Sequence, residues 1–170
     1  RAKDVEIVFP YMKSYKIRDL TLYRASLCEP LKREKYVLFL GDSVTQGADV
    51  IHDANTWQKM LADHWELSVL NQGSCGQVFE PGSLPPLSAL PAVPEKVVCA
   101  FGTNDWQFAS AEKKELRIQN LKEYLRRLHG LFPNTETYVI TPAFRRDEAA
   151  PRTFCTMKEW RGVVAAPGQG

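Results

Sequence analysis

The feature that most constrains this sequence is the alternation of short apolar runs with amphipathic stretches. Four runs of β-forming residues are separated by loops and helical patterns: Tyr36–Leu40, Leu67–Leu70, Val97–Phe101 and Thr137–Ile140. Several of these runs are apolar on both faces, which is typical of strands that helices cover on each side of a sheet. The alternation predicts an α/β fold with a parallel, doubly wound sheet.

Helical patterns lie between the runs. In the first, the residues at 3.6-residue spacing are Trp57, Met60, Leu61 and His64. Asn55 or Thr56 is a candidate N-cap. A second helix, Leu116–Leu128, has a leucine stripe and is expected to stop at Gly130. The proline-rich segment Pro81–Pro94 reads as an irregular connection with one short helix, and a further helix is expected over 156–166.

The first 30 residues differ from the rest of the chain. Glu6–Pro10 and Ile17–Leu22 read as two strands. We interpret 1–30 as an N-terminal β segment, a remnant of an upstream β-sandwich domain, and 31–170 as the α/β domain. An arm packed on the sheet is the alternative for residues 1–30.

Charge and composition exclude several classes of function. The formal net charge is +2 and basic clusters are short, which argues against nucleic-acid binding. No apolar run approaches the roughly 18 residues that span a bilayer. The four cysteines form no C-x-x-C pair and have no zinc-ligand spacing, so we expect reduced thiols, no metal and a cytoplasmic location. The chain starts without Met, so an export signal further upstream stays open.

A serine follows the first apolar run directly, in Gly41-Asp42-Ser43. In parallel sheets the loops after the carboxyl ends of the strands hold the functional site. A serine in this turn projects above the sheet edge, and the N-terminus of a following helix favours negative charge there. Gly41 permits a sharp turn and Asp42 can bond local backbone amides. The α/β-hydrolase pattern G-x-S-x-G fails, because Thr45 stands two residues after Ser43.

Two more polar loops follow strands at the same predicted edge. Asn71–Gln77 follows the second strand and Gly102–Asp105 follows the third. Acyl transfer through serine needs donors aimed at the oxyanion of the tetrahedral intermediate. The backbone amides of Ser43 and Gly76 and the side-chain amide of Asn104 could supply three. Adjacent parallel strands lie about 5 Å apart, so these loops can converge.

These three blocks together resemble the SGNH (GDSL-type) hydrolase superfamily. Gly41–Gly47 is similar to its first signature block, Gly76 falls at the glycine of the second, and Gly102–Asp105 is similar to the third. The resemblance runs from about Tyr36 to Pro142. It implies a flavodoxin-like three-layer α/β/α sandwich. It also implies a metal-free reaction without cofactors, in which acetyl or short acyl groups on carbohydrates, or acyl lipids, are hydrolysed.

The resemblance also assigns the residues of the site. It implies that Ser43 is the nucleophile and that Gly76 and Asn104 complete the oxyanion hole with the Ser43 amide. Gly73 is the competing glycine of the second block. Gly76 is preferred because the glycine of the family lies several residues past the asparagine that ends the strand.

Residues beside these blocks are candidates for contacts with a small-molecule or glycan ester. Trp106 and Phe108 follow the third block, and Phe79 follows the second. Aromatic faces suit sugar rings and acyl chains. Asp42 is placed with them on the substrate side. Ordinary packing in the core is the alternative for each aromatic side chain.

The base that a serine nucleophile requires is not evident. The resemblance places it in a D-x-x-H block near the C-terminus, and that part of this chain has no D-x-x-H. His52, in the segment after Ser43, is the histidine that could approach the site, whereas His64 and His129 are expected at or within helices. We therefore expect that the α/β domain is C-terminally incomplete and that this chain has little or no activity.

Two other functions stay open. The polar loop Asp42–Gly47 could cradle a phosphate in a flavodoxin-like sheet, as in a nucleotide or flavin site. Against this, the sequence has no G-x-G-x-x-G and no P-loop pattern. A non-catalytic member of the same fold that only binds carbohydrate is the third hypothesis.

Overall fold

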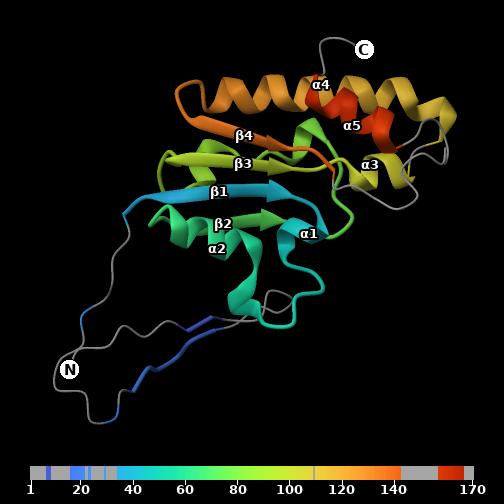
Figure 1. The fold of residues 1–170 in the computed structure, drawn as a ribbon. Helices are drawn as coiled ribbons and strands as arrows, with labels where there is room; N and C mark the ends of the chain where they lie inside the picture. Colours follow the sequence, from blue (N-terminus) through green and yellow to red (C-terminus); the bar gives the residue numbers. More distant parts are fainter. Residues whose placement is uncertain are drawn as a thin grey trace.

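A computed structural model describes residues 7–8, 16–21, 23, 29, 34–108, 110–142 and 157–166 of the chain. Figure 1 shows a twisted sheet whose strands all point the same way. Within the described residues the sheet has four parallel strands in the order β2-β1-β3-β4. The expected α/β fold with a parallel sheet is confirmed.

The element bounds agree closely with the sequence patterns. The strands are β1 (Tyr36–Gly41), β2 (Ser68–Gly73), β3 (Lys96–Ala100) and β4 (Glu136–Ile140). The helices are α1 (Ser43–Gln46), α2 (Trp57–His64), α3 (Thr103–Phe108), α4 (Lys114–Leu131) and α5 (Met157–Ala165). The 3-10 turns are η1 (Asp53–Asn55), η2 (Pro81–Ser83), η3 (Leu87–Ala89) and η4 (Ala111–Lys113).

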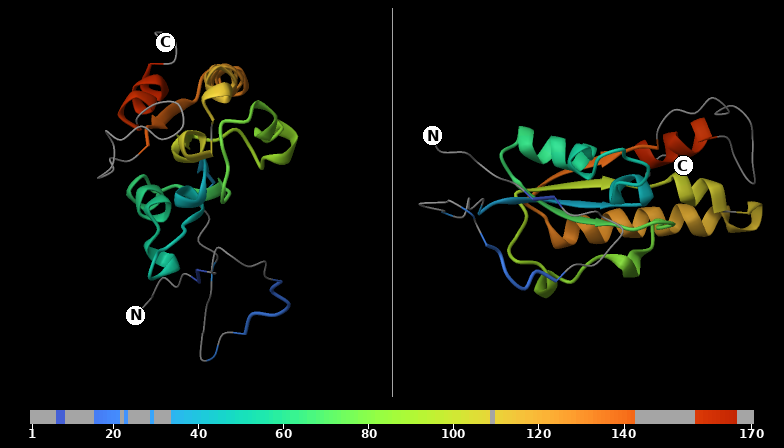
Figure 2. Two further views of the ribbon diagram at one scale, coloured as in Figure 1. Left: turned by 90° about the vertical axis from the view of Figure 1, so that its right-hand side faces the viewer. Right: turned by 90° about the horizontal axis from the view of Figure 1, so that it is seen from below.

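Helices cover both faces of the sheet, as the three-layer prediction requires. In the two views of Figure 2, α2 and α5 lie on one face, and α4 lies on the other with η2 and η3. The central strand β1 divides its side chains between the faces. Leu38 and Leu40 belong to the large cluster that includes the buried residues of α4, whereas Val37 and Phe39 pack with Ala62 of α2. This alternation is the expected period of two along a strand.

The strand register places the three polar loops, after β1, β2 and β3, at the same level of the sheet. Gly41, the last residue of β1, is paired with Gly73 at the end of β2 and with Ala100 at the end of β3. Helices α1 and α3 therefore start from the same rim, at the ends to which the strand arrows point in Figure 1.

Three expectations about local structure were wrong. Helix α4 does not stop at Gly130 but continues to Leu131. In α2 the buried residues are Gln58 and Ala62, whereas Met60 is 63% exposed. The expected strand Ile17–Leu22 is not formed, since residues 17–21 are exposed and belong to no strand. Glu6–Pro10 lies mostly outside the described residues, and the division of the chain at residue 30 stays a prediction.

Other expectations can be compared directly. Pro81–Pro94 contains two 3-10 turns, η2 and η3, where one short helix was expected. The helix expected over 156–166 is α5. No helix in the described part of the chain is long and apolar enough to cross a bilayer.

Candidate active site

The turn from β1 into α1 presents Ser43 at the rim of the sheet. Asp42 is the N-cap of α1, and its Oδ1 accepts a hydrogen bond from the Val44 amide at 3.0 Å. Gly41 has no room for a side chain, since a Cβ would lie 2.0 Å from Thr45 Oγ1 and 2.7 Å from the Ala100 carbonyl oxygen. Ser43 is the first residue of α1 and is partly exposed.

Helix α1 is one turn long, and side chains from other elements bind its carbonyl groups. The Val44 oxygen accepts hydrogen bonds from Trp57 Nε1 at 3.1 Å and Gln58 Nε2 at 2.9 Å. The Thr45 oxygen accepts from Gln58 Nε2 and from Asn71 Nδ2, the latter at 2.8 Å. Because an isolated turn of helix is unstable in water, these long-range bonds are what hold the serine turn in place. A pattern search for apolar faces does not find Gln58 or Asn71, because both are polar.

Gly73 and Gly76, the two candidate glycines of the second block, differ in packing, in backbone conformation and in the hydrogen bonding of their amides. A Cβ on Gly73 would lie 2.3 Å from Gln46 N, so this glycine lets β2 pack directly against α1. The Gly73 amide already donates to Asn71 Oδ1 at 2.8 Å. Gly76 lies in an exposed turn at φ +78°, a conformation that favours glycine. Its amide has no hydrogen-bond partner among the described residues, which leaves Gly76 as the available donor.

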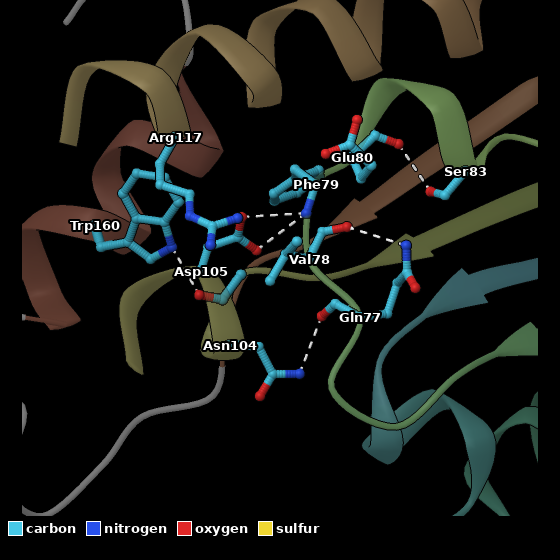
Figure 3. Close-up of polar contacts among 10 residues, drawn as sticks. Gln77, Val78, Phe79, Glu80, Ser83, Asn104, Asp105, Arg117 and Trp160 are labelled. Carbon is cyan, nitrogen blue, oxygen red and sulfur yellow. Dashed lines mark hydrogen bonds and ion pairs between the residues drawn. The ribbon is translucent and has the colours of Figure 1, made fainter. Parts of the chain in front are cut away.

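Asn104 in α3 is oriented toward the second loop. Its side chain is 8% exposed, and Nδ2 donates to the Gln77 carbonyl oxygen at 3.0 Å (Figure 3). A carboxamide nitrogen carries two hydrogens. One hydrogen of Asn104 Nδ2 is donated to the carbonyl oxygen of Gln77, the residue after Gly76, and the second hydrogen is available for another acceptor. Asn104 is thereby linked to the Gly76 turn.

Asp105, the next residue, is a fully buried carboxylate. The Phe79 amide donates to Oδ1 at 3.1 Å and Oδ2 at 3.2 Å. Arg117 of α4 places Nη1 3.9 Å from Oδ1 (Figure 3). Burial raises the pKa of Asp105 to about 6, although the Phe79 amide and Arg117 oppose the rise. Burial also raises the pKa of Asp42, against the amides of Val44 and Thr45. Asp105 belongs to the third block, but the sequence pattern predicts no role for it.

The candidate substrate contacts are mostly internal. Phe79 and Trp106 are both 0% exposed and belong to the large core cluster, so the packing alternative is the one observed for them. Asp42 is 4% exposed and serves as the N-cap of α1, which is a structural position. None of these three side chains presents a surface to a substrate in this structure.

The three histidines all lie within the described residues. His52 is exposed and is the N-cap residue of η1 without a side-chain cap bond. His64 and His129 are exposed in the last turns of α2 and α4. These helices lead into the first residues of β2 and β4, at the end of the strands opposite to the rim that carries Ser43. No hydrogen bond joins Ser43 to any histidine. His129 lies in the last turn of α4, as expected, whereas His64, which was expected inside the first helix, is the last residue of α2.

The loop after β3 is also tied to α5. Trp160 Nε1 donates to the Gly102 carbonyl oxygen at 2.7 Å, and the indole is fully buried (Figure 3). Gly102 has φ +119°, and a Cβ at this position would lie 2.7 Å from Pro142 Cγ and 3.3 Å from Trp160 Nε1. Among the described residues no cluster of His, Cys, Asp or Glu could hold a metal ion. Cys75 is an exposed free thiol beside Gly76, and Cys99 is buried.

The sequence model of the GDSL-like Lipase/Acylhydrolase family matches residues 39–166. This match begins in β1 and includes all three polar blocks. A search of the curated proteins found no match.

Solved structures share the fold at low sequence identity. A lipase/acylhydrolase from Enterococcus faecalis is 20% identical, with a TM-score of 0.54 over 79% of this chain and 71% of that one. A possible lipase from Chitinophaga pinensis is 20% identical, with a TM-score of 0.58 over 80% and 64%. A family two carbohydrate esterase from Clostridium thermocellum, solved with cellohexaose, is 16% identical, with a TM-score of 0.56 over 83% and 51%. The chain thus spans between half and three quarters of the length of these proteins.

Proposed function

We propose that this chain, which belongs to the GDSL-like lipase/acylhydrolase family, cleaves carboxylic esters with Ser43 as the nucleophile. The observation that carries the proposal is the register of the sheet, which sets the three polar loops at one rim through the pairing of Gly41 with Gly73 and Ala100. The hydrogen bond from Asn104 to Gln77 supports it, since it joins the third block to the second.

In the proposed reaction, Ser43 Oγ attacks the carbonyl carbon of the ester while its proton passes to a base. The oxyanion that forms accepts hydrogen bonds from the Ser43 amide, the Gly76 amide and Asn104 Nδ2. Collapse of the tetrahedral intermediate releases the alcohol, which takes up a proton, and leaves an acyl group on Ser43. Water then attacks the acyl-enzyme and releases the carboxylic acid. No metal or cofactor takes part.

We further propose that the 170-residue chain by itself turns over slowly. None of its histidines is bonded to Ser43, and a hydroxyl at its ordinary pKa is a weak nucleophile. Added imidazole should then accelerate hydrolysis of p-nitrophenyl acetate beyond the rate that imidazole gives without the protein, because it supplies the proton acceptor from solution. Loss of activity in H52A without imidazole would instead identify His52 as the base.

The decisive controls are single variants. S43A should abolish both the hydrolysis in excess of that by imidazole alone and labelling by a fluorophosphonate probe. S83A, which changes an exposed serine in η2, should leave both unchanged. If S43A hydrolyses as fast as the unmodified chain, or if the probe labels another residue, the proposal is wrong. Flavin absorbance of the purified protein would support the nucleotide-binding alternative instead.

For the substrate we propose an acetyl or short acyl ester of a carbohydrate. The solved carbohydrate esterase supports this choice by its shared fold alone. Initial rates on an acetylated glycoside and on matched esters of longer acids would test it. A preference for long acyl chains would contradict the proposal, and glycan binding without labelling of Ser43 would support a non-catalytic binding protein.

A further inference from the structure

The buried carboxylate of Asp105 is not used by the reaction proposed above. It lies beside Asn104 on α3, and the two side chains hold alternate residues of one loop: Asn104 Nδ2 donates to the Gln77 carbonyl oxygen, and Asp105 accepts from the Phe79 amide. Figure 3 shows both pairs side by side. Gly76 immediately precedes this doubly held segment.

We propose that Asp105, with Arg117 as its counter-ion, is a positioning residue that fixes the second loop relative to α3 and so sets the oxyanion hole. The proposal rests on the proposed function, since it concerns the same site. Both carboxylate oxygens lie within hydrogen-bond distance of a single amide, at 3.1 Å and 3.2 Å. The Phe79 ring that follows is fully buried and packs edge-on against Tyr124 of α4, so the segment is held on both its backbone and its side chain.

The clamp requires the ionised carboxylate. Protonation replaces an acceptor oxygen by a hydroxyl and removes the attraction to Arg117, whose Nη1 lies at 3.9 Å. Within the described part of the chain, the other titratable groups that interact with Asp105 are Asp42, from the turn before α1, and Cys99, from β3. Burial and Asp42 oppose ionisation, whereas Arg117 and the Phe79 amide favour it. The balance puts the pKa of Asp105 at about 6.

Amide NMR spectra recorded from about pH 4.5 to about pH 8 on the isotope-labelled chain test the clamp. The Phe79 backbone amide and the Asn104 side-chain amide should titrate together, with one inflection near the pKa of Asp105. In D105N this inflection should be lost, while the amide of residue 79 keeps one acceptor. E80Q is the matched control, because Glu80 is an exposed carboxylate beside Phe79. Its spectra should retain the inflection.

A kinetic measurement supplements the spectra. In the imidazole-assisted assay, D105N should lower kcat by about 10- to 100-fold with little change in KM, the effect of a misplaced donor. R117M should act in the same direction and should shift the inflection upward, because it removes the cation that favours ionisation. R117M also keeps the test valid if D105N fails to fold.

The outcomes separate this proposal from the proposed function. An inflection lost in D105N with no ester hydrolysis under any condition supports the clamp and overturns the esterase proposal. Hydrolysis that depends on Ser43 but is insensitive to D105N, with no titration of the Phe79 amide, overturns the clamp alone. An inflection that disappears in E80Q assigns the titration to Glu80 and likewise overturns the clamp.

Discussion

Replacing Gly73 by alanine should displace the serine turn. The new Cβ would lie 2.3 Å from Gln46 N, 2.6 Å from the Thr45 carbonyl carbon and 2.8 Å from Gln46 Cα. All three are backbone atoms, so no side-chain rotation relieves the clash. Ordinary contact begins at 3.4 Å, and 3.4 minus 2.3 gives a displacement of α1 by about 1 Å. Overpacking of this kind costs roughly 1–3 kcal/mol of folding free energy.

The same displacement should affect the reactivity of Ser43 more strongly than the stability of the fold. A misplacement of about 1 Å can cost roughly 100-fold in rate, whereas 1–3 kcal/mol lowers the melting temperature of a chain of this size by about 2–12 °C. The rate of fluorophosphonate labelling at Ser43 and urea unfolding measure the two effects. G82A is the control, because its nearest neighbour would be 3.8 Å away. If G73A labels and unfolds like the unmodified chain, the close contact between β2 and α1 is wrong.

Three other changes have defined outcomes. G130A should raise the free energy of unfolding by about 0.5–1 kcal/mol in urea titrations, because the site lies inside α4 with open space around it; destabilisation would contradict the α4 bounds. N104A should lower imidazole-assisted hydrolysis by about 100- to 1000-fold, the usual effect of losing one oxyanion donor; an unchanged rate would exclude Asn104 from the site. The third change is of pH. The folded pKa of Asp105, about 6, lies above the ordinary 3.8, so the native state binds more protons between these values. The stability that this group contributes is therefore present below about pH 4 and is lost as pH rises through 6. The loss is roughly 3 kcal/mol, because the folded pKa of about 6 and the ordinary pKa of 3.8 differ by about 2.2. Urea unfolding at several pH values should show this decline in the unmodified chain and not in D105N.

The sheet could be predicted from the sequence because its strands are short, apolar and separated by clear breaks. Each strand was placed within a few residues of its observed bounds, and the three polar blocks were assigned to the correct strand ends. The order β2-β1-β3-β4 and the register that aligns Gly41 with Gly73 and Ala100 came only from the structure.

Burial was harder to predict where polar contacts override the apolar pattern. The 3.6-residue spacing predicted that Met60 would face the core, yet Met60 is exposed and Gln58 is buried. The reason is that the carbonyl groups of α1 need hydrogen-bond donors, which a methionine cannot supply. Phe79 and Trp106 lie next to the signature blocks in the sequence but pack inward. Position along the chain does not reveal the direction of a side chain in a loop.

The serine turn has a consequence for protein engineering. Its helix is too short to exist on its own, and the bonds that complete it come from Trp57, Gln58 and Asn71, between 13 and 26 residues away along the chain. Transplanting the heptapeptide Gly41–Gly47 onto another parallel sheet would therefore carry over the reactive group without its scaffold. A successful graft would also need a carboxamide donor from the next helix, another from the neighbouring strand, and a glycine where that strand meets the turn.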